Sequence, residues 1–423
     1  MWGGALCLAA LAACARAESG TRLVIWGLGR EGEVLRELVP DFERAHPGVR
    51  VEVQQIPWTA AHEKLLTSFV GRSSPDVAQL GNTWIPEFHA IGALLPLDAR
   101  VAASHSVSRE DYFAGIWDTN VLGGETWGVP WYVDTRVLFY RSDLLRDAGY
   151  TEMPHHWSEW KTALRAMRAR FGPNQWPMLL PSDEWVQPAI FGIQSGSPLL
   201  GDGGRRGAFA EAQFAGATEF YLDFFRSGLA PRMGINDIAN LYQQFADGTF
   251  AMTVSGPWNL GEFRRRLPEL AGRWTTAPMP APDGTPWPGA SLAGGASLAV
   301  FKSTPHPELA WQLVEFLSTR EALLRLYALS GDLPPRRSVW EAPELAGDRE
   351  AQAFRVQLGN AVSTPKLPEW ERIATALYER LEPAIRGQAS GGEVLRRLDA
   401  QVDDMLVKRR WMLDRGAAAG GMP

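Results

Sequence analysis

The chain has 423 residues, of which 45% are hydrophobic and 21% are charged, and this is the profile of a soluble globular protein with two or three domains. A net charge of −6 argues against nucleic acid or an anionic membrane surface as a partner, because both require a basic face. The 18 tryptophans are unusual in number, and each can serve either a core or a flat platform for a ligand.

The chain begins with a segment typical of export. The apolar run over residues 5–14 is too short to span a bilayer. It ends in "LAAC", the pattern that a bacterial lipoprotein peptidase cuts before a lipidated Cys14, whereas the following "ARA" favours an ordinary cut after Ala17. Residues 1–17 are therefore expected to form a signal or lipobox region. The other cysteine, Cys7, lies in the same segment, so no disulfide is expected in the mature chain.

The first hundred mature residues alternate between strand and helix patterns. The hydrophobic spacing predicts strands over 23–27, 49–56 and 75–80, and helices over 33–46, 60–71 and 84–93, with Pro40 kinking the first helix or starting a new turn. This order predicts a parallel sheet with right-handed crossovers. Ligands of such sheets bind beyond the carboxyl ends of the strands, here after Trp26 and after Leu80.

Farther along, irregular links rich in Gly and Pro separate the elements. The expected elements are strands over 126–129, 137–140, 251–254 and 297–303, helices over 157–170, 208–225 and 306–319, and mostly helix from 339 to about 413. The links lie at 123–141, 277–295 and 329–338, and three crossings between two lobes predict a bilobal binding protein. The N-terminal lobe is expected to comprise 20–128 and 293–332, and the C-terminal lobe 129–292 and 333–415, followed by a disordered tail over 416–423.

Motifs for catalysis are not found in the sequence. It contains no G-x-S-x-G elbow, no H-E-x-x-H pair and no P-loop, so neither a cofactor nor a metal is predicted. The adjacent residues His155 and His156 point apart on most backbones and are expected to be solvated or to cap a helix. Carboxylates that are distant in sequence cannot be paired without a structure, so a glycoside hydrolase remains an alternative.

Aromatic and planar polar residues gather at strand ends and links. A saccharide presents hydroxyls at its rim and C–H groups on its faces, so a site for it needs aromatic platforms and side chains that make paired hydrogen bonds. The candidates are Glu31, Asn82, Thr83, Trp84, Trp131 with Tyr132, Asp134 with Arg136, Glu184, Trp185, Trp258, Gly294 and Gly295.

The chain resembles the extracellular solute-binding proteins of carbohydrate ABC importers, the maltose-binding protein family. The resemblance runs from Leu23 to about Val407, and the stretches that carry it include "GVPWYVDTRVLFYRSDLL", "AMTVSGPWNL", "GGASLAVFKSTPHPELAWQLVEFLST" and "GDLPPRRS". It implies an α/β fold of two lobes joined by three crossover segments, with the ligand cleft between them.

The resemblance also implies roles for particular residues. Asp134 matches a carboxylate on sugar hydroxyls, Trp258 and Trp370 match two stacking tryptophans, Arg336 matches a ligand-binding arginine, and Gly294 and Gly295 match a backbone close to the sugar. Asn82, Thr83 and Trp84 fall in a polar loop of the family, but its acidic residue is Thr83 here and its aromatic residue is Leu80. The contacts of the N-terminal lobe therefore depart from the pattern.

These observations predict a binding protein rather than an enzyme. It is expected to be a periplasmic or lipid-anchored monomer that captures a neutral saccharide, such as the gluco-disaccharides maltose or trehalose, for membrane permease subunits. The alternatives are a glycerol-phosphodiester or sugar-phosphate binder, for which Arg30, Arg136 and Arg336 are the candidate cations, a secreted glycoside hydrolase, and a sensor for a membrane receptor.

Overall fold

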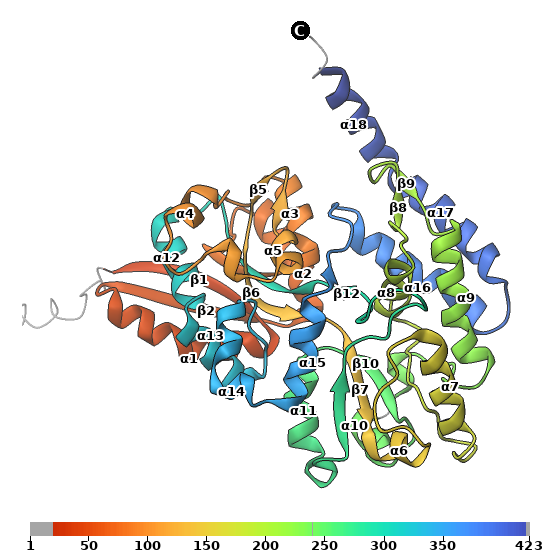
Figure 1. Ribbon diagram of the computed structural model, residues 1–423. Helices are drawn as coiled ribbons and strands as arrows, with labels where there is room; N and C mark the ends of the chain where they lie inside the picture. The colour runs from red at the N-terminus through yellow and green to blue at the C-terminus, as the bar shows by residue number, and fades with distance from the viewer. Residues whose placement is uncertain (1–19, 239, 420–423) are drawn as a thin grey trace, which may run out of the picture.

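A computed structural model describes residues 20–238 and 240–419 as two α/β lobes that lie side by side (Figure 1). The N-terminal lobe is built on a five-stranded sheet in the order β2-β1-β3-β13-β6. Strand β1 (Thr21–Leu28) pairs in parallel with β2 (Val49–Ile56) and β3 (Val77–Gly81). The predicted parallel arrangement is confirmed for this half of the sheet, whereas β13 (Gly294–Val300) returns antiparallel to β3 and β6 (Val129–Asp134).

Helix α1 (Gly29–Ala45) begins directly after β1, four residues before the expected start. Gly29 has a φ of +53°, a conformation that glycine adopts without steric cost, and this allows the abrupt turn from strand to helix. Leu35, Leu38 and Phe42 are buried on one face, as the spacing predicts. Pro40 lies inside α1, so the expectation of a new turn there is wrong.

The first link between the lobes runs from β6 to β7 (Val137–Arg141). The strand expected over 126–129 is wrong, because the chain enters the sheet only at Val129. Pro130 is tolerated in β6 because this strand lies at the edge of the sheet. The boundary expected between 128 and 129 assigns β6 to the C-terminal lobe, whereas β6 belongs to the sheet of the N-terminal lobe. The other lobe limits stay a prediction.

The C-terminal lobe contains the antiparallel sheet β10-β7-β11, in which β10 is Met252–Ser255 and β11 is Trp274–Ala277. Its hydrophobic core gathers side chains from the sheet, from Leu145 of α6 (Ser142–Asp147), and mainly from the helices α7 (Trp157–Arg168), α8 (Val186–Gln194), α9 (Ala212–Arg226), α16 (Trp370–Ile385) and α17 (Gly391–Met405). Trp160, Phe191 and Phe224 are fully buried there. The predicted strand at 251–254 and the helices expected over 157–170 and 208–225 correspond to β10, α7 and α9.

The fold contains further helices, 3₁₀ turns and short strand pairs. The helices are α2 (Trp58–Val70), α3 (Ile85–Ala90), α4 (Asp98–Ala103), α5 (Ala114–Asp118), α10 (Leu241–Ala246), α11 (Trp258–Arg266), α12 (Pro307–Leu317), α13 (Arg320–Ser330), α14 (Pro343–Ala346), α15 (Arg349–Leu358) and α18 (Val407–Ala419). Single 3₁₀ turns are η1 (Asn82–Trp84), η2 (Arg109–Asp111), η3 (Ile235–Asp237) and η4 (Pro268–Leu270), and η5 (Arg337–Glu341) is longer. Short strand pairs are β4 (Val121–Leu122) with β5 (Glu125–Thr126), β8 (Leu200–Gly201) with β9 (Arg206–Gly207), and β12 (Ser291–Leu292) with β14 (Ala361–Val362).

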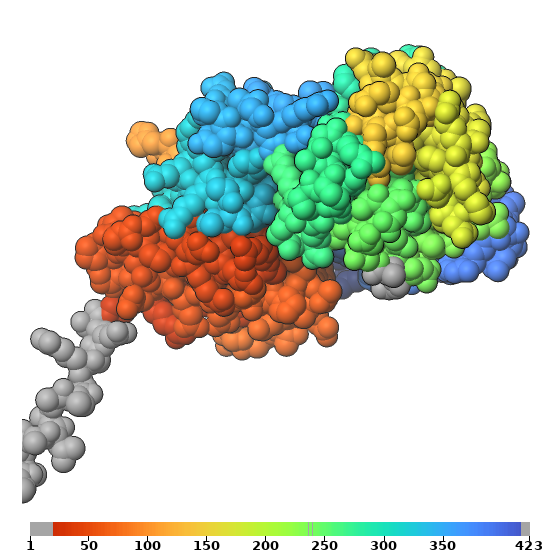
Figure 2. Space-filling view, turned by 90° about the horizontal axis from the view of Figure 1, so that it is seen from below, coloured from red at the N-terminus to blue at the C-terminus, as the bar shows by residue number. Residues whose placement is uncertain are grey.

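Segments distant in sequence complete each lobe. In the space-filling view, the red and orange N-terminal residues group with the cyan stretch, while the yellow and green residues form the other mass (Figure 2). The third link lies beside the first, because Leu333 bridges Val133 of β6.

The C-terminal end of the described chain is a helix, α18. Helix α18 projects from the C-terminal lobe and extends to Ala419, and the disorder expected over 416–423 stays a prediction (Figure 1). Residues 420–423 and the predicted signal region 1–17, with Cys14, lie outside the described residues. Within the described ranges, no helix has the length and apolar character needed to cross a membrane.

Candidate ligand-binding site

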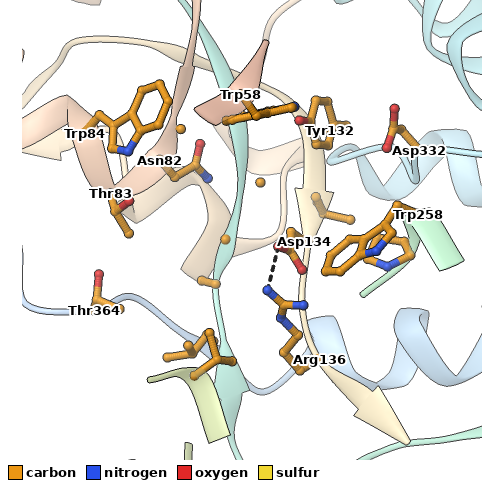
Figure 3. Close-up of a pocket in the computed structure, with 18 of the residues that line it drawn as sticks. Trp58, Asn82, Thr83, Trp84, Tyr132, Asp134, Arg136, Trp258, Asp332 and Thr364 are labelled. Atoms are coloured by element: carbon orange, nitrogen blue, oxygen red, sulfur yellow. Dashed lines mark ion pairs between the residues drawn. The ribbon is translucent and has the colours of Figure 1, made fainter. Parts of the chain in front are cut away.

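A cavity of about 550 Å³ lies between the lobes, where strand ends and links converge (Figure 3). The N-terminal lobe contributes the start of α1, the start of α2, η1 and the end of β6. The C-terminal lobe contributes the starts of α8 and α11, and three further segments bring Leu292–Gly295, Asp332 and Thr364. The carboxyl ends of β1 and β3 open into this cavity, as expected for ligand sites of parallel sheets.

Two buried carboxyl groups face each other at one end of the cavity. Glu31 in the first turn of α1 is 8% exposed, and Asp332 in the third link is 4% exposed. Burial raises the pKa of both side chains, and the negative charge of Glu31 adds to the rise for Asp332. Hydrogen bonding to Trp58, Asp332 and Tyr132 opposes the rise in the pKa of Glu31.

Tyr132 lies beside these carboxyls on β6. Its hydroxyl accepts a hydrogen bond of 3.1 Å from Gln79 Nε2. Burial and the nearby charges of Glu31, Asp332 and Asp134 raise the pKa of Tyr132 well above its ordinary value. The phenol therefore stays protonated, and its single hydrogen is available to the Glu31 carboxyl.

An ion pair lies in the middle of the cavity, where β6 ends. Arg136 Nη2 lies 3.4 Å from Asp134 Oδ2, and the guanidinium carbon lies 4.5 Å from the centroid of the Trp258 ring (Figure 3). Burial raises the pKa of Asp134, and the charge of Arg136 opposes this rise. The arrangement presents a carboxylate and a guanidinium side by side, which suits adjacent hydroxyl groups of a ligand.

Aromatic rings form walls on both sides. In the N-terminal lobe, the rings of Trp58 and Trp84 lie 5.6 Å apart at 64°. His62 lies behind Trp84, with ring centroids 5.0 Å apart, and its Nε2 lies 2.7 Å from Glu87 Oε2. This hydrogen bond to Glu87 raises the pKa of His62. The histidine thus fixes one wall of the cavity from outside it.

The opposite wall is formed by the C-terminal lobe. Trp258 begins α11 directly after the Ser255-Gly256-Pro257 turn and is 40% exposed. A Cβ at Gly256 would lie 1.8 Å from Cζ3 of the Trp258 ring, so the glycine makes room for this ring. Trp185 also lines the cavity, and its ring meets Trp370 edge-on at 5.5 Å.

Comparison with known proteins identifies the family. Residues 26–323 match the model of the bacterial extracellular solute-binding proteins. The chain belongs to this family. The sugar-binding protein MalE of Xanthomonas citri is 45% identical, with a TM-score of 0.89 over 93% of this chain and 99% of MalE. The diacetylchitobiose-binding protein DasA of Streptomyces coelicolor is 24% identical over 90% of this chain and 91% of DasA. The galactooligosaccharide-binding protein of Bacillus subtilis is 25% identical over 91% of each.

The predicted family and the bilobal α/β fold are thus confirmed. Of the fifteen candidate residues named from the sequence for a saccharide site, the structure places eleven on the cavity of this solute-binding protein. They are Glu31, Asn82, Thr83, Trp84, Tyr132, Asp134, Arg136, Trp185, Trp258, Gly294 and Gly295. That they contact a ligand stays a prediction.

Gly294 and Gly295 are required by the packing of β13 against β6. A Cβ at Gly294 would lie 2.8 Å from the carbonyl oxygen of Asp134, and one at Gly295 would lie 2.2 Å from that of Tyr132. Gly295 also has a φ of +120°. The close approach of β13 to β6 therefore requires both glycines, whether or not a ligand is bound.

Four predicted residues do not line the cavity, and two of them are tryptophans. Trp131 is fully buried because side chains alternate along β6, which turns Tyr132 toward the cavity and Trp131 into the core. Trp370 is 1% exposed in the core of the C-terminal lobe and supports Trp185 from behind. Trp370 therefore does not line the cavity in this structure, and its role as a stacking residue stays a prediction.

The other two are held by neighbouring polar groups. Arg336 Nε donates to Asp111 Oδ2 at 2.7 Å and its Nη1 donates to the carbonyl oxygen of Ser318 at 2.7 Å, both outside the cavity. Glu184 Oε2 accepts a hydrogen bond of 2.8 Å from Gln187 Nε2 in the next turn. Arg336 therefore joins parts of the fold, in contrast to its predicted role.

Among the polar and aromatic residues that line the cavity, sequence reasoning missed three, namely Trp58, Asp332 and Thr364. Trp58 and Asp332 had a usable signal: Trp58 follows the carboxyl end of β2, and Asp332 lies in the third link directly after Gly331. Thr364 follows β14 and had no signal in the sequence. Among the described residues, no group of His, Cys, Asp and Glu side chains could hold a metal ion.

Proposed function

We propose that this solute-binding protein captures a neutral saccharide, a gluco-disaccharide such as maltose or trehalose, and delivers it to the permease subunits of an ABC importer. The observation that carries the proposal is the cavity between the lobes, in which aromatic walls face an array of carboxyl, amide and guanidinium groups. Its volume of about 550 Å³ lies within the range of small-molecule sites. The saccharides in the names of its relatives support the ligand class.

Capture and delivery would be linked through closure of the lobes. The lobes already contact each other at one edge of the structure. Lys366 Nζ donates to Asp118 Oδ1 at 2.9 Å, to the Asp118 carbonyl oxygen at 3.1 Å and to the Val121 carbonyl oxygen at 3.0 Å. Ser363 Oγ donates to Asp118 Oδ2 at 2.9 Å. Because Thr364 of the same segment lines the cavity, a bound ligand can stabilise this contact.

Outside the cytoplasm, the protein would act as a periplasmic monomer, released by a cut after Ala17 or held at the membrane by a lipid on Cys14. Mass spectrometry of the protein from membrane fractions distinguishes the two forms. A sensor role requires a receptor in place of a permease, and uptake of radiolabelled sugar by vesicles that contain the permease subunits tests the transport role.

A sugar-phosphate ligand is disfavoured by the charges of the cavity. Arg136 is already paired with Asp134, and Arg336 lies elsewhere. An added phosphate would meet the carboxyls of Glu31 and Asp332, which are already hard to ionise. The neutral saccharide is therefore the better match.

A thermal-shift and calorimetry screen tests the proposal. The panel contains maltose, trehalose, longer saccharides and the phosphorylated analogue of each. A saccharide at ~100 times its dissociation constant should raise the free energy of unfolding by about 2.7 kcal/mol. Binding of the phosphorylated analogue alone would favour the sugar-phosphate alternative, and time-dependent release of monosaccharide would favour the hydrolase. Absence of any shift in folded protein would refute the proposal.

A further inference from the structure

The Glu31–Asp332 pair is unusual for a buried polar contact because both of its members are carboxyl groups. The two carboxyls come from residues 301 positions apart and lie within hydrogen-bonding reach of each other. One oxygen of each group, Glu31 Oε2 and Asp332 Oδ2, has no hydrogen-bond partner among the described residues. Two ionised carboxylates offer only acceptors, so the pair requires either a shared proton or a cation.

Nearby arginines do not supply that cation. Arg136 is paired with Asp134 and lies over the Trp258 ring. The guanidinium of Arg30, at the rim of the cavity, pairs with Glu33 and contacts the Leu329 carbonyl oxygen at 3.4 Å. In the part of the chain that the structure describes, no salt bridge involves Glu31 or Asp332. The acidic end of the cavity is therefore open to a positive charge from the ligand.

Aromatic side chains surround the same end. Trp58 and Tyr132 lie within hydrogen-bonding reach of Glu31, and Trp258 lines the same cavity as Asp332 (Figure 3). The face of Trp258 is already covered by the Arg136 guanidinium, and Trp58 and Tyr132 present polar hydrogens to Glu31, so the attraction for an ammonium group comes from the two carboxyls. The polar groups around Asp134 and Asn82 remain available to the rest of a sugar.

We propose that the Glu31–Asp332 end of the cavity is an ammonium subsite, and that the protein binds an amino sugar, a saccharide carrying a protonated amine, more tightly than the corresponding neutral sugar. This inference rests on the proposed function and names a narrower ligand class for the same site. The ammonium group donates three hydrogen bonds, which satisfy the free oxygens of both carboxyls.

Proton exchange accompanies this binding mode. Before a ligand binds, burial keeps one proton on the Glu31–Asp332 pair, shared between the two carboxyls. The groups that face the pair are Trp58, Tyr132, Asp134 and the Ser330 hydroxyl. The ammonium ligand enters with its positive charge, the second carboxyl ionises, and the displaced proton passes to the solvent. A neutral sugar leaves the shared proton in place. Proton release therefore distinguishes the two ligand classes.

Matched ligands test the inference. Dissociation constants are measured by calorimetry for trehalose and maltose, for their monoamino-deoxy analogues substituted at each hydroxyl position, and for the N-acetyl derivatives, which lack the charge. At least one amine should bind about tenfold more tightly than its parent sugar, as expected for a close buried charge pair. N-acetylation should abolish the gain, and titration in buffers of different ionisation enthalpy should show proton release for the amine only.

Isosteric variants complete the test. Glu31→Gln combined with Asp332→Asn removes both charges and keeps hydrogen-bonding groups, so the gain from the amine should disappear. If this variant fails to fold, the proton release of the wild-type protein still decides the matter. The inference is overturned if every amine binds no more tightly than its parent sugar, or if the gain persists in the double variant, and in both cases binding of the neutral sugars leaves the proposed function intact. Failure of all saccharides to bind would instead remove the proposed function.

Discussion

The turn that presents Trp258 gives the sharpest prediction about the cavity. Trp258→Ala removes a ring that is 40% exposed. From a side chain of ~250 Å², this leaves about 100 Å² for a ligand to cover. At ~25 cal/mol per Å², complete coverage contributes about 2.5 kcal/mol, and coverage of half the surface about 1.2 kcal/mol. The dissociation constant should therefore rise between about 8-fold and 70-fold.

Calorimetry with the best saccharide of the screen measures this change. Trp411→Ala is the matched control, because Trp411 is 54% exposed on α18 and does not line the cavity. Its affinity should equal that of the wild-type protein. Thermal unfolding without ligand checks that both variants are folded. If Trp258→Ala binds the sugar as tightly as the control does, the ring is not a platform and the assignment of the cavity wall is wrong.

Four other changes address the surroundings of the site. Gly256→Ala should weaken binding as Trp258→Ala does, because its Cβ would lie 1.8 Å from that ring, and normal affinity in calorimetry would contradict this. Trp370→Ala should lower the free energy of unfolding by about 3–5 kcal/mol in denaturant titrations, since the side chain is 1% exposed; a cost under about 1 kcal/mol would show that it is not a core residue. Lys366→Met removes the ion pair with Asp118 and leaves the hydrogen bond of Ser363 in place. It should weaken binding about two- to fivefold with a more open shape in X-ray scattering, whereas an unchanged shape would exclude a role of Lys366 in closure. Burial raises the pKa of Asp332 to about 8 in the fold, above its ordinary value. The contribution of Asp332 to stability is therefore present at acidic pH and is lost as the pH rises through about 8. Asp332→Asn should flatten the decline of the unfolding temperature between pH 5 and pH 8.

The elements that set up the cavity were predictable because they depend on local patterns. Hydrophobic spacing located β1, β2 and β3, and their order predicted where ligand-binding side chains would gather. A glycine and a proline before Trp258 indicated a turn that exposes the following side chain. The helix start at Gly29 was missed, since a φ of +53° is not visible in a hydrophobic pattern.

The errors concern contacts between distant residues. Arg336 pairs with Asp111, 225 positions away, and nothing near either residue in the sequence indicates this partner. Trp131 and Tyr132 are neighbours of similar size, and only the alternation of β6 within the assembled sheet decides which of them faces the cavity. The role of Asp332 likewise depends on Glu31, because the third link brings Asp332 beside a residue near the start of the chain.

The pairing of charges, rather than their number, determines which ligand the cavity accepts. Arg136 and Asp134 neutralise each other, so they offer hydrogen bonds without attracting an ion. The Glu31–Asp332 pair lacks such a partner among the described residues, and its buried carboxyls resist a second negative charge. An anionic ligand would have to overcome this resistance, a neutral sugar would leave the shared proton in place, and a protonated amine would replace it. Affinity should consequently increase from phosphorylated to neutral to amino sugars of the same skeleton, an order that the aromatic walls alone would not produce.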